Sequence, residues 1–211
     1  MPARGLLIAF EGVDGSGKST QARILAEAVG ALLTFEPGAT ELGVALRRLL
    51  LEPGHQVPDV RAEVLLVAAD RAQHVAEVVL PALEEGRVVV TDRFSGSTLA
   101  YQGYGRGLPV EELRGLVGWA SAGLEPDLTI VVDVPPGVAR GRLEHGHEDR
   151  LEQLDEQFFC RVRDGYLALA GADPARWAVV DGDRDVATVA EAVREVVSRR
   201  LDLGPGPEQQ E

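Results

Sequence analysis

Basic residues are scarce in this 211-residue chain. Lysine and arginine together number 21 against 34 acidic residues, which gives a formal net charge of −13 at pH 7. Nonspecific binding of nucleic acids depends on basic side chains that neutralise phosphates, so we expect no nucleic-acid partner. Lysine is scarcer still, because Lys18 is the only one and the other members of the 21 are arginines.

Cysteine and long apolar runs are also nearly absent. The single cysteine, Cys160, excludes a disulfide within the chain, which fits a reducing compartment. No motif surrounds it, so we expect a buried structural thiol. The apolar run Leu6–Phe10 is too short for a signal peptide, and Val64–Ala69 is far shorter than a membrane span. We therefore expect a cytoplasmic protein with no membrane partner.

Five short and continuous apolar runs indicate strands that are buried on both faces, as in parallel sheets. These runs are Leu6–Phe10, Ala31–Phe35, Val88–Val90, Leu128–Val134 and Trp177–Val180. Helix-like segments alternate with the predicted strands. These segments are Gln21–Val29, Thr40–Leu51, Val60–Leu83, Pro109–Ala122, Glu152–Ala170 and Val186–Leu201. The alternation predicts an α/β fold in which helices flank a five-stranded, mainly parallel sheet.

No internal repeat or change of composition divides the chain. We therefore expect one domain over residues 1–203, and the sequence GPGPEQQE at 204–211 is typical of a disordered tail. The helical segment Val60–Leu83 carries apolar residues over more than one face. One face has to pack on the sheet, and the other needs cover from this chain or from a second copy.

The stretch Gly12–Ser19 matches the pattern G-x-x-x-x-G-K-[ST], between a predicted strand and a predicted helix. Its glycines allow backbone N–H groups to surround a phosphate, and the helix adds its positive dipole end. Lys18 is expected to reach the β- and γ-phosphates, where a compact ammonium fits and a broader guanidinium does not. We expect ATP to bind at Gly12, Val13, Asp14, Gly15, Ser16, Gly17, Lys18, Ser19 and Thr20.

The class of P-loop protein follows from what the rest of the chain contains. A GTPase needs a lysine in its guanine-reading N-K-x-D loop, and this chain has no second lysine. Long ATPase motors need more than 211 residues. A small-molecule kinase fits the length.

A series of further motifs follows in order: FEGVDGSGKST, EPGAT, AADRAQHV, PAL, VVTDRF, STLAYQG, PDLTIVVDV and DRLE. They occupy Phe10–Thr20, Glu36–Thr40, Ala68–Val75, Pro81–Leu83, Val89–Phe94, Ser97–Gly103, Pro126–Val134 and Asp149–Glu152. In this order and spacing the chain resembles the thymidylate kinases, of the nucleoside-monophosphate kinase group, over about residues 5–200. The resemblance implies transfer of the γ-phosphate of ATP to dTMP with Mg²⁺, in a homodimer that uses the helix around Val60–Leu83.

The resemblance also implies the acceptor site. Arg93 would bind the acceptor phosphate, and Asp14 would lie near the sugar 3′-hydroxyl and the metal. Thr98 would read the base edge, and Tyr101 would pack against the deoxyribose and crowd the 2′ position. The residues implied to bind the acceptor are Asp14, Glu36, Pro37, Arg71, Arg93, Thr98, Tyr101 and Gln102.

The resemblance further implies a lid near residues 140–151 that closes over the phosphates and excludes water. Its arginines are Arg140, Arg142 and Arg150. Because the loop has Gly15 where some relatives place an arginine, the lid has to supply one, with Arg142 the first choice and Arg140 the second. The implied catalytic residues are Lys18, Arg93, Arg142 and Asp14, and the implied Mg²⁺ ligands are Ser19 and Asp92.

Three positions depart from the family pattern. Phe35 stands where the family usually has an arginine, Val67 where it usually has an aromatic that stacks on thymine, and Glu144 at a usual lid arginine. The changes concern the acceptor half and leave the ATP half intact. Two alternatives therefore stay open: a kinase of another or a modified pyrimidine nucleoside monophosphate, and a nucleotide-binding protein with degraded catalysis.

Overall fold

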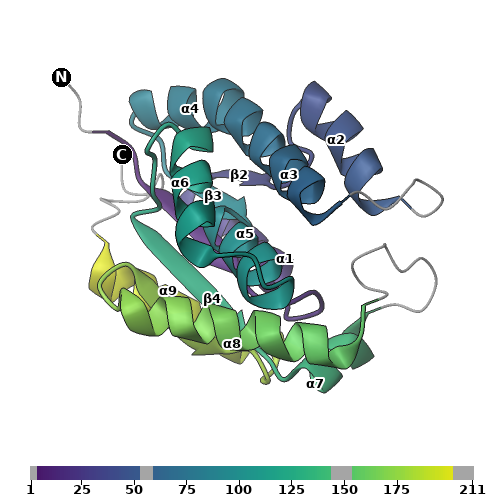
Figure 1. The fold of residues 1–211 in the computed structure, drawn as a ribbon. Helices are drawn as coiled ribbons and strands as arrows, with labels where there is room; N and C mark the ends of the chain where they lie inside the picture. The colour runs from purple at the N-terminus through teal and green to yellow at the C-terminus, as the bar shows by residue number, and fades with distance from the viewer. Residues whose placement is uncertain (1–3, 53–58, 144–153, 202–211) are drawn as a thin grey trace.

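A central parallel sheet organises the fold (Figure 1). The computed structural model describes residues 4–52, 59–143 and 154–201. Its strands are β1 (Leu7–Glu11), β2 (Leu32–Phe35), β3 (Val89–Asp92), β4 (Leu128–Asp133) and β5 (Trp177–Asp181). They lie in the order β2-β3-β1-β4-β5, and each neighbouring pair is parallel. The predicted fold class and the five predicted strands are confirmed.

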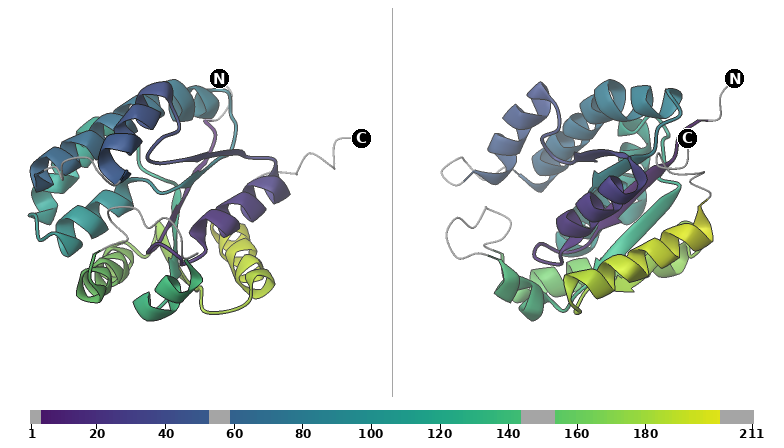
Figure 2. Two further views of the ribbon diagram at one scale, coloured as in Figure 1. Left: turned by 90° about the vertical axis from the view of Figure 1, so that its right-hand side faces the viewer. Right: turned by 180° about the vertical axis from the view of Figure 1, so that it is seen from behind.

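The two faces of the sheet are covered by different helices, because side chains alternate along each strand. Ile8 and Phe10 pack in a cluster with α1 (Lys18–Val29) and α9 (Val186–Arg200), and Figure 2 shows these two helices together on one face. Leu7 and Ala9 point to the opposite face, where they pack with the π-helical η1 (Val75–Val79) and with α4 (Leu80–Glu84). These strand residues are fully buried, and each large one contributes about 1.5–3 kcal/mol to stability.

The predicted helix over residues 60–83 forms as one rod of three consecutive pieces. These are α3 (Val60–His74), the π-helical η1 (Val75–Val79) and α4 (Leu80–Glu84). The other predicted helices appear as α2 (Glu41–Leu51), α6 (Val110–Ala120) and α8 (Glu156–Ala172), and residues 152–153 of the last prediction lie outside the described residues. No helix within the described ranges is both long and apolar enough to cross a membrane.

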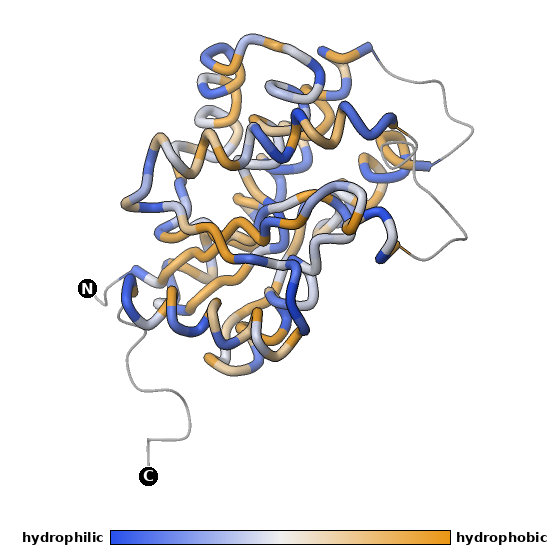
Figure 3. The backbone as a smooth tube through the Cα atoms, turned by 90° about the horizontal axis from the view of Figure 1, so that it is seen from below, coloured by the Kyte–Doolittle hydropathy of each residue, from blue (hydrophilic) through white to orange (hydrophobic). Residues whose placement is uncertain are grey.

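Three short helical pieces were not predicted. They are α5 (Ser95–Thr98), the π-helical η2 (Leu99–Gly105) and α7 (Pro136–Arg142). Glycines interrupt all three, and the sequence pattern alone therefore indicates loops. In the tube of Figure 3 the hydrophobic colour is concentrated along the strands and on one side of the helices.

The prediction of a buried Cys160 is wrong, because its side chain is exposed on α8. The inward face of this helix carries Phe158, Val162 and Tyr166, which recur every four residues and are buried. Cys160 lies two positions from Phe158 and therefore points to the outer face.

Candidate active site

The carboxyl ends of β1, β2 and β3 meet at one edge of the sheet and supply the loops of the site. This edge is where parallel α/β sheets bind their ligands. β1 leads into the glycine-rich loop, β2 into Glu36 and Pro37, and β3 into Arg93.

The glycine-rich loop packs tightly against α7. Gly15 has a φ of +80°, and a Cβ at this position would lie 2.1 Å from the backbone oxygen of Ala139. An arginine at position 15 would require α7 to move, which agrees with the expectation that such a group comes from elsewhere. Lys18 begins α1, its side chain is almost buried, and its Nζ lies 3.2 Å from Oδ1 of Asp14.

Asp14 joins the glycine-rich loop to the segment after β3. Its carboxylate forms an ion pair with Arg93 and accepts a 2.7 Å hydrogen bond from the hydroxyl of Tyr101. Burial raises the pKa of Asp14, but Arg93, Lys18 and the Tyr101 hydroxyl outweigh burial and hold this pKa well below its usual range. Asp14 is therefore an anion at neutral pH, in contact with Lys18 and Arg93.

Arg93 is held in an uncommon backbone conformation, with a φ of +71°. Residues other than glycine rarely adopt it, and they keep it only where the surrounding structure enforces it. Arg93 N donates to Phe10 O at 2.9 Å, and the Thr91 hydroxyl donates to Arg93 O at 2.8 Å. The guanidinium donates to Ser97 Oγ at 2.9 Å, which aims it at the loop.

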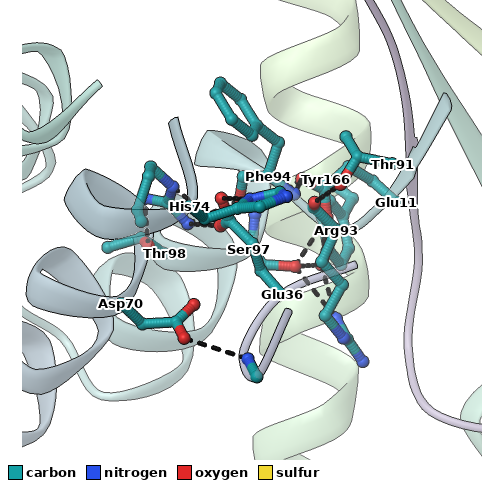
Figure 4. A network of polar contacts seen from close by, with 12 residues as sticks. Glu11, Glu36, Asp70, His74, Thr91, Arg93, Phe94, Ser97, Thr98 and Tyr166 are labelled. Carbon is teal, nitrogen blue, oxygen red and sulfur yellow. Dashed lines mark hydrogen bonds and ion pairs between the residues drawn. The ribbon is translucent and has the colours of Figure 1, made fainter. Parts of the chain in front are cut away.

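Glu11 ties the end of β1 to the segment that carries Arg93 (Figure 4). Its carboxylate accepts from the backbone N–H groups of Phe94 and Ser97 at 3.0 Å, from Ser97 Oγ at 2.6 Å and from Tyr166 OH at 3.0 Å. Burial raises the pKa of Glu11, and the hydrogen bond from Ser97 and the charge of Arg93 oppose the rise. The sequence prediction assigned no role to this residue.

A second buried network surrounds Glu36 at the end of β2. Arg71 Nε donates to its Oε2 and His74 Nδ1 lies by its Oε1, both at 2.9 Å. Arg71 also donates to Thr98 Oγ1 and to the carbonyl of Phe94, each at 2.9 Å. Burial raises the pKa of Glu36, but Arg71 and His74 outweigh it, and the net pKa is lowered. The network fixes α3, β2 and α5 against one another.

Asp70 holds the Glu36–Pro37–Gly38 loop from the side of α3 (Figure 4). Its Oδ1 accepts from Gly38 N at 2.9 Å, and its buried Oδ2 has no hydrogen-bond partner among the described residues. Burial and the nearby Glu36 carboxylate raise the pKa of Asp70 to about 6.

A cavity of about 110 Å³ opens between these networks and the glycine-rich loop. All the predicted acceptor residues line it, namely Asp14, Glu36, Pro37, Arg71, Arg93, Thr98, Tyr101 and Gln102. The sequence analysis missed several further lining residues, namely Arg47, Leu50, Leu51, Glu63 and Ser97. Val67 lines the cavity as well, whereas Phe35 is 45% exposed and is not among the lining residues that the structure describes.

The predicted lid arginines are separated in the structure. Arg140 lines a smaller cavity of about 50 Å³ between the glycine-rich loop, α7 and α8. Arg142 instead donates to Gly182 O at 2.9 Å and pairs with Asp183 at 3.0 Å, on the loop after β5. Arg150, Glu144 and most of the predicted lid lie outside the described residues, as does the predicted tail. The catalytic role of Arg142 stays a prediction.

The residues predicted to hold Mg²⁺ have suitable chemistry. Ser19 is exposed at the start of α1, and Asp92 Oδ1 is a buried oxygen with no hydrogen-bond partner among the described residues. The described ranges contain no group of three or more His, Cys, Asp or Glu side chains that could hold a metal. Mg²⁺ in kinases is bound by one or two protein oxygens together with substrate phosphates, so the donors present fit this ion.

A phosphate-binding loop that shares an acidic residue with an arginine-lined acceptor cavity, on a parallel α/β sheet, defines a P-loop kinase of the nucleoside-monophosphate type. The thymidylate kinase family profile matches residues 10–193. The chain belongs to the thymidylate kinase family, and the resemblance found in the sequence is confirmed.

Similar proteins cover nearly the whole chain. A thymidylate kinase of Desulforudis audaxviator is 46% identical over 195 residues, which are 90% of this chain and 88% of the relative. One from Bifidobacterium longum is 48% identical over 197 residues, with 90% and 95% covered. A solved thymidylate kinase from Ehrlichia chaffeensis matches with a TM-score of 0.75 and 33% identity, covering 93% of this chain and 99% of that one.

Proposed function

We propose that the protein transfers the γ-phosphate of ATP to dTMP and gives dTDP and ADP. Membership of the thymidylate kinase family supports this function. The observation that carries it is the shared Asp14, which contacts Lys18 of the phosphate loop and Arg93 of the acceptor cavity. A single residue then fixes the positions of the groups that bind the donor and acceptor phosphates, and phosphoryl transfer depends mainly on such positioning.

On the donor side, the backbone of Gly12–Thr20 surrounds the phosphates of ATP, and Lys18 neutralises charge that develops on the β- and γ-phosphates. Ser19 and Asp92 would hold Mg²⁺. The ion would supply charge neutralisation and orient the phosphates when bound. Asp14 is an anion, and its contact with Lys18 limits how far the ammonium can move before ATP binds.

On the acceptor side, Arg93 binds the dTMP phosphate, and Ser97 and Asp14 orient its guanidinium. Tyr101 donates a hydrogen bond to Asp14, which holds its ring in the cavity, where it crowds the 2′ position of the sugar and favours a deoxyribose. Thr98 accepts from Arg71 and keeps its own hydroxyl proton for a carbonyl of the base.

The direct test is an ATP-coupled assay of the purified chain with every common nucleoside monophosphate. We expect dTMP to be the best acceptor, dUMP weaker, and ribose forms such as UMP poor. Preference for UMP or CMP would favour the kinase of another pyrimidine nucleotide. No turnover with any acceptor, in a chain that still binds ATP, would favour the protein with degraded catalysis.

Two further properties are part of the proposal. The protein acts in the cytoplasm and forms a homodimer in which the second copy covers the outer face of α3. Leu65 is 58% exposed there, and Ala69 and Ala76 of the same rod are also exposed. Such a self-complementary helix face suits a two-fold contact. Light scattering at micromolar concentration tests it, and a mass near the 22.6 kDa of one chain would contradict it.

A further inference from the structure

In the side-chain amide of Gln102, the NH₂ group has a hydrogen-bond partner and the oxygen has none among the described residues. Its side chain is only 3% exposed and lines the acceptor cavity from the π-helical segment η2. Nε2 donates to Glu63 Oε1 at 2.9 Å, whereas Oε1 is buried and has no hydrogen-bond partner among the described residues. A buried polar atom without a partner is rare, and in a binding cavity it indicates a group that the ligand completes.

Glu63 determines which end of the amide is used. An ionised carboxylate only accepts hydrogen bonds, so it pairs with the NH₂ group of Gln102 and excludes the amide oxygen. Glu63 lies in the first turn of α3 and is 1% exposed. Arg106, four residues after Gln102, donates to Glu63 Oε2 at 3.1 Å and compensates its buried charge. Arg106 therefore pairs with Glu63, and Oε1 of Glu63 accepts from the NH₂ group of Gln102.

We propose that Glu63 is a positioning residue for base selection. By holding the NH₂ group of Gln102, it presents the amide oxygen of Gln102 to a base that carries an N–H donor at ring position 3. Thymine and uracil have this donor, whereas cytosine has an acceptor there and would place two acceptors face to face. The inference rests on the proposed function, because it concerns the acceptor cavity of that reaction.

The magnitude of the effect follows from the cost of leaving buried polar groups unpaired. A site built to pair with a hydrogen-bonding group rejects an analogue that lacks it far better than an apolar site rejects a change of size. The substitution Glu63→Gln replaces an acceptor-only group by one that can also donate. The Gln102 amide can then turn over and offer its NH₂ group to cytosine.

The experiment compares kcat/KM for dTMP and dCMP in three variants, with thermal unfolding as a check on folding. Glu63→Gln should narrow the dTMP/dCMP ratio by about tenfold or more, mainly through KM, because the lost contact is already made in the ground state. The matched control is Arg106→Gln, which removes the same ion pair and keeps the carboxylate. This control should leave the ratio within about twofold of the wild type.

Gln102→Met keeps the test decisive if Glu63→Gln does not fold. Gln102→Met should also narrow the dTMP/dCMP ratio of kcat/KM. The double variant Glu63→Gln/Gln102→Met should have the same ratio as Gln102→Met alone. The inference is overturned if Glu63→Gln or Gln102→Met retains the wild-type ratio, or if Arg106→Gln narrows it equally. Failure of the wild type to phosphorylate dTMP at all would instead overturn the proposed function.

Discussion

The donor half and the acceptor half of the site are built in different ways. The donor half is mostly backbone, with glycines at sharp turns and a single lysine at the start of α1. The acceptor half is mostly buried side chains, in which Arg71, Glu36 and His74 form one network and Glu63, Gln102 and Arg106 another. Asp14 is the residue that belongs to both halves.

The two halves also differ in how much the stability of the protein depends on each of them. A backbone cradle needs little more than permitted torsion angles, so its stability does not depend on distant partners. A buried ion pair is costly to desolvate, and removing one partner leaves the other charge uncompensated. We therefore expect substitutions in the donor half to reduce catalysis with little loss of stability, and those that break a buried ion pair in the acceptor half to reduce both.

The largest expected effect is on Lys18. Lys18→Ala should lower kcat by about 100- to 1,000-fold, because a donor to the transferring phosphoryl group is lost. Lys18→Arg should fail similarly, since the broader guanidinium does not fit the cradle. Steady-state kinetics and thermal unfolding check both points. Near-normal turnover by Lys18→Arg would show that the shape of the cradle does not explain the lone lysine.

Arg71→Lys tests the acceptor half. It keeps the charge beside Glu36 but loses hydrogen bonds to Thr98 and to the Phe94 carbonyl. We expect dTMP affinity to fall by about 10- to 100-fold and the protein to lose stability. ATP affinity should change by less than about twofold. The matched control is Arg61→Lys, on an exposed position of the same helix, and calorimetry with each nucleotide gives the answer.

Equal losses of dTMP and ATP affinity in Arg71→Lys would contradict the separation of the two halves. A loss of dTMP affinity in Arg61→Lys as well would show that the effect is not specific to the contacts of Arg71.

Asp70→Asn tests how the buried carboxylate of Asp70 affects the stability of the protein as the pH changes. The pKa of Asp70 is raised to about 6 in the folded protein, so its stabilising effect is present at low pH and is lost as the pH rises through that value. The variant mimics the protonated form. Its stability relative to the wild type should therefore increase by about 2–3 kcal/mol between pH 4 and pH 7.

Urea denaturation at several pH values, with the exposed Asp164→Asn as control, measures this change. A stability difference that does not vary with pH would mean that Asp70 is not held near Glu36 as described.

The smallest expected effect is an increase in dTMP affinity. Val67 lines the cavity at the position where the family has an aromatic that stacks on the base, and Phe35 is not among the described lining residues. Val67→Phe should tighten dTMP binding by about two- to tenfold through ring stacking. Arg61→Phe, at an exposed position of the same helix that is not among the residues of the proposed dimer contact, is the control. Weaker binding in calorimetry would mean that another group already fills the space.

Much of the fold was predictable because its strands are buried on both faces. Continuous apolar runs such as Leu128–Val134 have few other interpretations in an alternating chain. The helical pieces between Ser95 and Gly105 could not be predicted, because tertiary packing determines their conformation. A Cβ at Gly105 would lie 2.6 Å from the Phe158 ring, so glycine here permits close packing of η2 on α8.

The site was predictable where the motif is local. Gly12–Ser19 is continuous in the sequence, and its backbone does the binding. Glu11 and Glu63 were missed because a lone acid in an apolar segment is usually a surface residue. Their partners lie far along the chain, since Glu11 meets Tyr166 and Glu63 meets Gln102. Only the folded arrangement identifies such pairs.

The most direct test of the separate halves is a calorimetric titration of Lys18→Ala with dTMP in the absence of ATP. Lys18 contacts Asp14 but does not line the acceptor cavity. We predict that the dissociation constant for dTMP stays within about threefold of the wild-type value, although phosphoryl transfer is lost. Loss of dTMP binding in this variant would contradict the account, because it would show that the acceptor half depends on the lysine of the donor half.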